Sequence, residues 1–150
     1  REVPVWLKVN RVSRNQIMAI KEESVTEQKN SLAVCLDNIL RHAGITRNTE
    51  YDLAQGKTAT TILSENMTGV QVLDLSGCTL DGVLYYVNQD IPVLAILEDG
   101  EAVLVTGFNE FNVVIMEPAT GKLYKKGMND ATAWFAENGN HFITYMRTEN

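Results

Sequence analysis

Three side chains stand out as candidate nucleophiles, one serine and the two cysteines of the chain. Ser31 opens the amphipathic segment 31–43, Cys35 falls on the apolar face of that segment, and Cys78 lies in the turn SGCT. A thiol among apolar neighbours behaves as a small hydrophobic group, so Cys35 is expected in the core. Ser31 could attack a substrate or cap the helix, and a role without catalysis, as a cap or as a relic, is favoured. A disulfide between the cysteines stays open, since spacing alone does not fix pairing.

A nucleophilic hydroxyl or thiol needs a base that accepts its proton, and histidine is the usual one. The chain has two histidines. His42 lies near the end of the same predicted helix as Ser31, roughly 16 Å away along the axis. An exposed residue at the helix end is therefore the favoured interpretation of His42. His141 begins the last apolar segment, where an ordinary strand residue is favoured over a substitute base.

The segment 31–43 carries the clearest helical pattern in the chain. Asn30 or Ser31 can cap its first turn, and Gly44 can end it in the left-handed conformation that glycine adopts readily. The pattern predicts a helix with one buried face. The residues predicted on that face are Leu32, Cys35, Leu36, Ile39, Leu40 and Ala43.

Apolar spacing and turn residues predict the other elements. Segment 14–23 fits a strand or a short helix, 23–30 is a polar loop, and turns are expected at 98–101, 119–122 and 124–127. Helices that precede antiparallel strands indicate the α+β class. The further predicted helices are 58–66, 79–89 and 128–139. The predicted strands are 3–9, 70–75, 91–97, 102–108, 113–118 and 141–146.

The length and composition fit one globular domain over residues 1–150, with 45% hydrophobic and 21% charged residues. The net charge of −6 and the absence of a basic stripe argue against a nucleic-acid partner. No apolar run approaches the length of a membrane helix. Because the sequence starts without Met, it is expected to be a domain of a longer protein. The predicted core is Leu36, Ile39, Leu40, Val93, Leu94, Val103, Val105, Val114 and Ile115.

Four segments together resemble papain-like cysteine peptidases of the double-glycine leader peptidase group (peptidase C-thirty-nine). They are NSLAVCLDNILRHAG (30–44), TLDGVLYYVNQDIPVLAIL (79–97), DGEAVLVTGFNE (99–110) and IMEPATGK (115–122). The resemblance spans residues 25–146. It implies a papain-like α+β fold in which an N-terminal buried helix packs on an antiparallel β-sheet. Residues before 25 are then an N-terminal extension or an extra strand.

The resemblance also assigns the catalytic positions of that group to residues of this chain. Ser31 falls on the nucleophilic cysteine, Glu101 on the general-base histidine, and Glu117 on the aspartate that orients the histidine. The glutamine that stabilises the oxyanion in such sites would fall at Val25, and Gln28 is a poorly placed substitute.

These departures from the family pattern bear directly on chemistry. A carboxylate such as Glu101 is a poor base for a serine hydroxyl, because the two groups differ greatly in proton affinity. Glu101 and Glu117 could share a cation, but two carboxylates without histidine or cysteine are a meagre ligand set. No phosphate-binding loop, zinc spacing or dinucleotide fingerprint is found, so no metal or cofactor is expected.

The resemblance and the altered positions lead to three hypotheses. The first is a catalytically inactive papain-like domain. It would serve as a peptide-binding or structural module of a larger secreted or cell-surface protein of bacterial origin. Its partners would be an extended peptide or other domains of the parent chain. The second is a cysteine peptidase in which Ser31 replaces the nucleophilic cysteine. The third is a structural module without a ligand.

Overall fold

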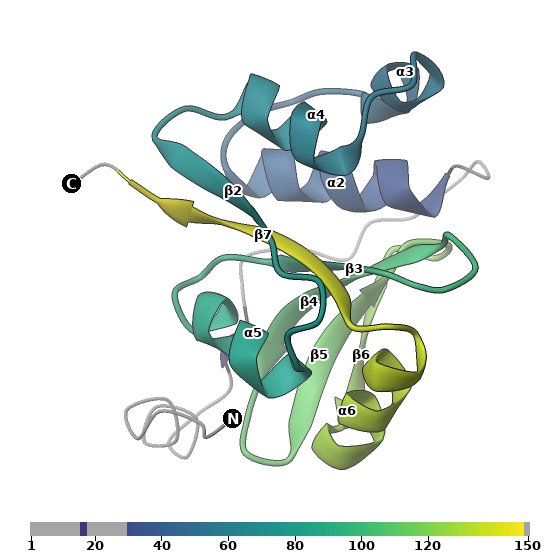
Figure 1. The fold of residues 1–150 in the computed structure, drawn as a ribbon. Coiled ribbons are helices and arrows are strands. Elements are labelled where there is room, and N and C mark those ends of the chain that lie inside the picture. Colours follow the sequence, from purple (N-terminus) through teal and green to yellow (C-terminus); the bar gives the residue numbers. More distant parts are fainter. Residues whose placement is uncertain (1–15, 18–29, 149–150) are drawn as a thin grey trace.

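The computed structural model describes residues 16–17 and 30–148, which form an α+β fold (Figure 1). Its helices are α2 (Ser31–His42), α3 (Thr49–Ala54), α4 (Ala59–Asn66), α5 (Leu80–Val87) and α6 (Met128–Glu137). Its strands are β1 (Gln16–Ile17), β2 (Val70–Asp74), β3 (Val93–Ile96), β4 (Ala102–Phe108), β5 (Asn112–Glu117), β6 (Lys122–Gly127) and β7 (His141–Arg147).

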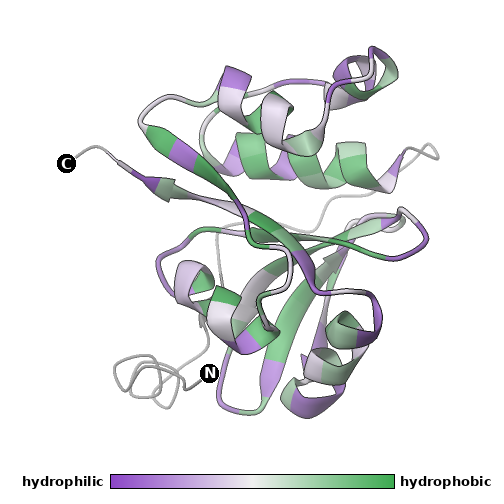
Figure 2. Cartoon of the chain, viewed as in Figure 1, coloured by the Kyte–Doolittle hydropathy of each residue, from purple (hydrophilic) through white to green (hydrophobic). Residues whose placement is uncertain are grey.

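The strands form one antiparallel sheet in the order β2-β7-β3-β4-β5-β6, and β1 pairs additionally with β4. Helix α2 contacts β3 and β4 with α3 and α4 beside it, whereas α5 and α6 contact the sheet from the other side (Figure 1). Strand β4 is buried along its whole length, as expected for a strand that is covered on both faces. Figure 2 shows the apolar residues gathered on the central strands and on the helix faces turned toward them.

Helix α2 begins as its sequence predicts, and the cap is Asn30. The Asn30 side chain accepts hydrogen bonds from the backbone N–H groups of Leu32, at 2.8 Å, and Ala33, at 3.3 Å. Of the two predicted caps, Asn30 is therefore the one that forms, and Ser31 is the first helical residue, whose hydroxyl does not cap the helix. The helix ends before Gly44, whose φ of 88° lies in the left-handed region that glycine adopts at little cost.

The predicted core is confirmed, because all nine of its residues are buried and all except Val114 belong to a single hydrophobic cluster. On the predicted apolar face of α2, the four central residues are buried, Leu32 is partly buried, and Ala43 is exposed. The error at Ala43 arises because the helix ends one residue earlier, at His42, so Ala43 does not continue its buried face. The nine core residues lie on α2, β3, β4 and β5, which makes α2 the helix that closes this face of the sheet.

Several local predictions are corrected by the structure. The segment predicted as the turn 124–127 belongs to β6, which pairs with β5 over its whole length. Its lysines are those of an edge strand, where charge discourages pairing with other chains. Helix α3 was not predicted. Helix α6 has Gly127 at its N-cap position and no side-chain cap.

The N-terminal predictions are tested only in small part. The described pair Gln16–Ile17 is extended, which favours the strand over the helix for segment 14–23. The strand predicted over 3–9 and nearly all of the loop 23–30 lie outside the described residues. Within residues 16–17 and 30–148, no helix is long and apolar enough to cross a membrane.

Candidate functional site

The Ser31 hydroxyl lies at the junction of α2 and β4. Its Oγ accepts a hydrogen bond of 2.9 Å from the backbone N–H of Ala102, the first residue of β4. The two residues are 71 positions apart in sequence. The family resemblance assigns Ser31 to the nucleophile and Glu101, the residue before Ala102, to the base. The hydrogen bond therefore brings these two assigned positions close together.

Glu101 is positioned by a tight turn between β3 and β4. Leu97 closes the turn by donating its N–H to the Glu101 carbonyl at 2.7 Å and accepting from the Gly100 N–H at 2.9 Å. The Asp99 side chain accepts from the Glu101 N–H at 2.9 Å. The turn therefore fixes the Glu101 backbone directly before Ala102, while the Glu101 side chain is exposed.

Glu117 ends β5, and its carboxylate accepts a hydrogen bond from the backbone N–H of Ala119. Besides burial, its negative charge raises the pKa of two neighbouring groups, Cys35 and Tyr124. Burial raises the pKa of the Cys35 thiol strongly and Glu117 raises it further, and the same two causes raise the pKa of Tyr124. Cys35 lies one helical turn after Ser31, so the Glu117 carboxylate lies on the side of the sheet that α2 covers.

Ser31, Glu101 and Glu117 thus lie around one end of the sheet, where α2 begins, although they come from distant parts of the sequence. The fourth predicted site residue, Gln28, lies outside the described residues. Among the described residues, no group of three or more His, Cys, Asp or Glu side chains is arranged to hold a metal ion. The acidic turn predicted at 98–101 is exposed.

Both histidines of the chain lie away from Ser31. His42 ends α2, and its Nε2 lies 3.1 Å from the Asp90 carbonyl oxygen and 3.5 Å from Asp90 Oδ2. Only 9% of the His42 side chain is exposed, so the prediction of an exposed helix-end residue is wrong. The α5–β3 loop folds over the helix end and covers this imidazole.

His141 begins β7 and is an ordinary strand residue, as favoured by the sequence. It pairs with Ile96, which in turn pairs with Ala102 on β4. Neighbouring strands are about 4.8 Å apart, so the backbone of His141 lies roughly 10 Å across the sheet from that of Ala102. The structure shows no hydrogen bond between Ser31 and either of the two histidines. The pKa of Asp74, on β2, is lowered by hydrogen bonds from Ser76 and further by the charge of His141, so the His141 imidazole acts on the β2 side of the sheet.

The partner of the Ser31 hydroxyl could not be predicted from the sequence, because that partner is a backbone N–H. Nearly every buried N–H needs an acceptor, and the side chain that supplies it depends on tertiary packing. As an acceptor, Ser31 Oγ keeps its own proton available for a hydrogen bond to another group. The arrangement can therefore hold a polar ligand atom without any proton transfer.

Replacing Ser31 by Ala is expected to lower the free energy of unfolding by about 1–2 kcal/mol, because the Ala102 N–H loses its acceptor in a partly buried place. Urea denaturation followed by circular dichroism measures the change. Ser64→Ala, on the exposed side of α4, is the matched control and is expected to stay within about 0.5 kcal/mol. Equal stability of the two variants would show that the Ser31 contact contributes nothing.

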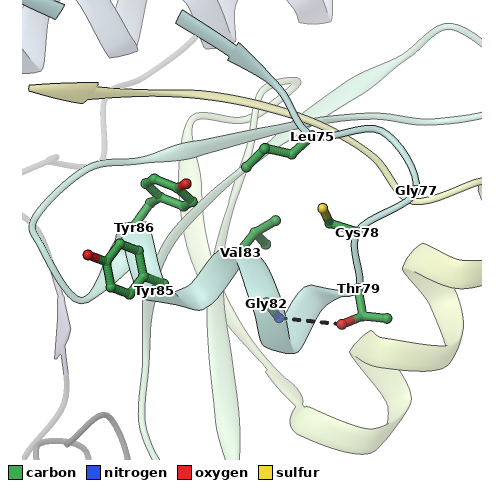
Figure 3. Close-up of a pocket in the computed structure, with 8 residues that line it drawn as sticks. All are labelled: Leu75, Gly77, Cys78, Thr79, Gly82, Val83, Tyr85 and Tyr86. Atoms are coloured by element: carbon green, nitrogen blue, oxygen red, sulfur yellow. Dashed lines mark hydrogen bonds between the residues drawn. The ribbon is translucent and has the colours of Figure 1, made fainter. Parts of the chain in front are cut away.

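A separate hollow of about 470 Å³ lies beside α5, on the opposite side of the sheet from α2 (Figure 3). Cys78, immediately before the Thr79 cap of that helix, points toward the space between Leu75 and Val83. Cys78 is exposed and Cys35 is buried, and both thiols are free, so the disulfide left open by the sequence does not form. The hollow is lined by Leu75, Gly77, Cys78, Thr79, Gly82, Val83, Tyr85 and Tyr86.

No protein-family model matches the chain. No curated protein matches it in sequence. Among solved structures, the chain is similar to a protein from Bacillus anthracis described as a "putative C39-like peptidase". The TM-score is 0.71 at 12% sequence identity, and the likeness covers 89% of this chain and 98% of the other. The chain therefore has the α+β, papain-like fold of a C39-like peptidase.

Proposed function

We propose that this chain is a catalytically inactive, peptidase-like domain that holds an extended peptide where α2 meets the turn between β3 and β4. The observation that carries the proposal is the hydrogen bond between Ser31 Oγ and the Ala102 N–H, with Glu101 directly before it. Helix α2 contacts strand β4, as the helix and strand that carry the catalytic residues do in a papain-like site. The histidine that would transfer the proton in such a site is replaced by Glu101.

The positions of the ionisable groups support binding without catalysis. A serine hydroxyl becomes a nucleophile when an adjacent base takes its proton. The two histidines are held elsewhere, one by Asp90 and one on β7. Cys35, the thiol closest in sequence to Ser31, is buried, and its raised pKa keeps it protonated. A single Cys→Ser change does not account for the glutamate at position 101, which disfavours the alternative of a cysteine peptidase that lost only its thiol.

A peptide could be recognised here by polar contacts alone. The Ser31 hydroxyl, the Glu101 carboxylate and the Glu117 carboxylate lie near the start of β4 and the end of β5. An extended peptide presents alternating N–H groups and side chains, which carboxylates and hydroxyls can bind. The wider role that we propose is that of a module in a secreted or cell-surface protein.

The test is a titration of the 15N-labelled domain with pools of random decapeptides. The expected result is a set of saturable shifts of the backbone amides of Ser31, Ala102 and Glu117, with no peptide fragments detected by mass spectrometry. Glu101→Trp is expected to weaken binding about tenfold or more by filling the site, because losing one buried contact region costs on the order of 1.4 kcal/mol. Glu110→Trp, on the exposed turn after β4, is the control and should leave binding unchanged.

Two results would contradict the proposal in different ways. Peptide fragments that disappear in Ser31→Ala would show that the domain is an enzyme. The absence of any peptide-induced shift would favour a structural module that has the fold but no peptide ligand. Equal weakening by Glu101→Trp and Glu110→Trp would place the peptide somewhere else on the domain.

A further inference from the structure

A second cavity, of about 500 Å³, lies at the opposite end of α2 from Ser31. Three parts of the chain form it: the end of α2, the turn from α4 into β2, and the end of β7, which lie together in Figure 1. Because α2 spans 12 residues, this cavity is roughly 16 Å from the Ser31 hydroxyl. It is lined by His42, Ala43, Ile45, Met67, Thr68, Gly69, Val70, Tyr145 and Arg147.

Tyr145 supplies an unpaired polar group to this cavity. Its side chain is 3% exposed and belongs to the hydrophobic core, yet it lines the cavity. The structure gives its hydroxyl no hydrogen-bond partner among the described residues. Among the described residues, the buried side-chain polar atoms without a partner are Asp81 Oδ2, Asn88 Oδ1 and Asn140 Oδ1, so the Tyr145 hydroxyl is accessible from the cavity. It can therefore donate a hydrogen bond to a molecule bound there. Burial raises the pKa of Tyr145, so the hydroxyl remains a proton donor at neutral pH.

Arg147 supplies a positive charge from the same strand. Residues 145 and 147 are two apart on β7, so both side chains leave the same face of the sheet. The pairing of Arg147 with Val70 and the hydrogen bond of 2.9 Å from the Thr148 N–H to the Gly69 carbonyl hold this end of the strand against β2. One guanidinium nitrogen donates to the Gln89 carbonyl at 3.2 Å. Four of the five guanidinium N–H donors remain for other acceptors.

The surroundings limit the negative charge that the cavity can accept. Among the described residues that line it, Arg147 is the only permanently positive one. The Asp90 carboxylate is close enough to add to the raised pKa of Tyr145, and it lies 3.5 Å from His42 Nε2. The carboxyl end of the α2 helix dipole, at His42, also disfavours anions. A single negative charge is therefore better matched than the double charge of a phosphate.

We propose that this cavity binds a small monocarboxylate with a short aliphatic chain. The carboxylate receives hydrogen bonds from the Arg147 guanidinium and the Tyr145 hydroxyl, a pairing of donors that suits its two oxygens. The aliphatic chain lies against Ile45, Met67 and Val70. This site is independent of the peptide site proposed at the other end of α2.

Butyrate is the probe, titrated into the 15N-labelled domain and compared with butyramide and inorganic phosphate. The expected result is a saturable shift of the Gly69, Val70 and Tyr145 amides at millimolar butyrate, the range for so small a ligand. Butyramide, the same size without the charge, should bind about tenfold more weakly. Arg147→Gln should weaken butyrate binding to a similar extent, and Tyr145→Phe, which keeps the ring in the core, should weaken it by a smaller factor.

Lys125→Gln is the control, because it removes one positive charge from an exposed position on β6, at the other edge of the sheet. Butyrate binding unchanged in this variant supports the site, whereas an equal loss would indicate general charge attraction. Equal binding of butyramide and butyrate, or unchanged binding in Arg147→Gln, would overturn the proposal. Tighter binding of phosphate than of butyrate would overturn the choice of a monocarboxylate.

Discussion

The combined variant Ser31→Cys and Glu101→His is expected to react with iodoacetamide about tenfold faster at pH 6 than Ser31→Cys alone. The thiolate is the reactive form, and a free thiol with an ordinary pKa near 8.5 is almost wholly protonated at this pH. An imidazolium beside the thiol lowers its pKa and raises the thiolate fraction more than it reduces intrinsic reactivity. The contact between Ser31 and the residue after Glu101 places the two substituted positions side by side.

The pH profile of alkylation is the measurement that separates pairing from simple exposure. In the combined variant the midpoint of the profile should fall by about one unit or more relative to Ser31→Cys alone, because the thiolate is stabilised by the imidazolium. Adding Glu117→Gln should reverse part of the shift if that carboxylate orients the introduced imidazole, as the family resemblance implies.

The two natural thiols serve as internal references in the same samples. Cys78 is exposed and should be alkylated at the ordinary rate in all variants. Cys35 is buried with a raised pKa and should stay unmodified while the domain is folded. Identical profiles at position 31 in the single and combined variants would show that positions 31 and 101 do not face one another. That result would not test peptide binding by the natural chain, which the separate peptide titration measures.

Replacing Leu36 by Ala is expected to lower the free energy of unfolding by about 2–5 kcal/mol. Leu36 is fully buried on α2, in the cluster that joins this helix to the sheet. The substitution removes apolar contacts and leaves a cavity that the packed strands cannot close completely. Because small domains are stable by only about 5–15 kcal/mol, this one change would remove a large share of the stability.

Urea unfolding followed by circular dichroism measures the loss in the Leu36→Ala variant. Leu32→Ala, the same substitution on the same helix at a partly buried position, is the matched control and should cost less. A cost for Leu36→Ala no greater than that of the control would show that α2 does not close this face of the sheet. An unchanged m-value would indicate that the variant still unfolds as one unit.

Periodic apolar spacing predicted most of the elements that support the candidate site. The run that contains Leu36, Ile39 and Leu40 fixed the helix α2, and the strand 102–108 was predicted with the bounds that the structure has. Such patterns are legible in sequence because helices and strands repeat their buried face at different intervals. The resemblance to the double-glycine peptidase group added the arrangement of these elements, and the structural likeness supports that fold.

Elements without a strong apolar pattern were missed. Strand β6 carries three lysines at an edge, and pairing with β5 rather than its own sequence makes it a strand. Helix α3 is short and is held by tertiary contacts. The Thr49 hydroxyl donates to the Asp37 side chain at 2.7 Å, and the Arg47 guanidinium bonds the Asp52 carboxylate at 2.9 Å. The hydrogen bond from Arg47 lowers the pKa of Asp52, and neither contact can be read from the apolar spacing of the sequence.

The sequence by itself determined the α+β class, the buried helix that starts at Ser31, the apolar core and the inventory of chemical groups, including the fact that only two imidazoles exist. These properties are local or compositional, so residue type and spacing are sufficient to define them. Only the tertiary structure decided that the Ser31 hydroxyl bonds the Ala102 N–H, that His42 is covered by the loop at Asp90, and that Tyr145 and Arg147 line one cavity. Each of these depends on the distance between segments far apart in the chain, and the packing of the whole sheet and its helices sets those distances.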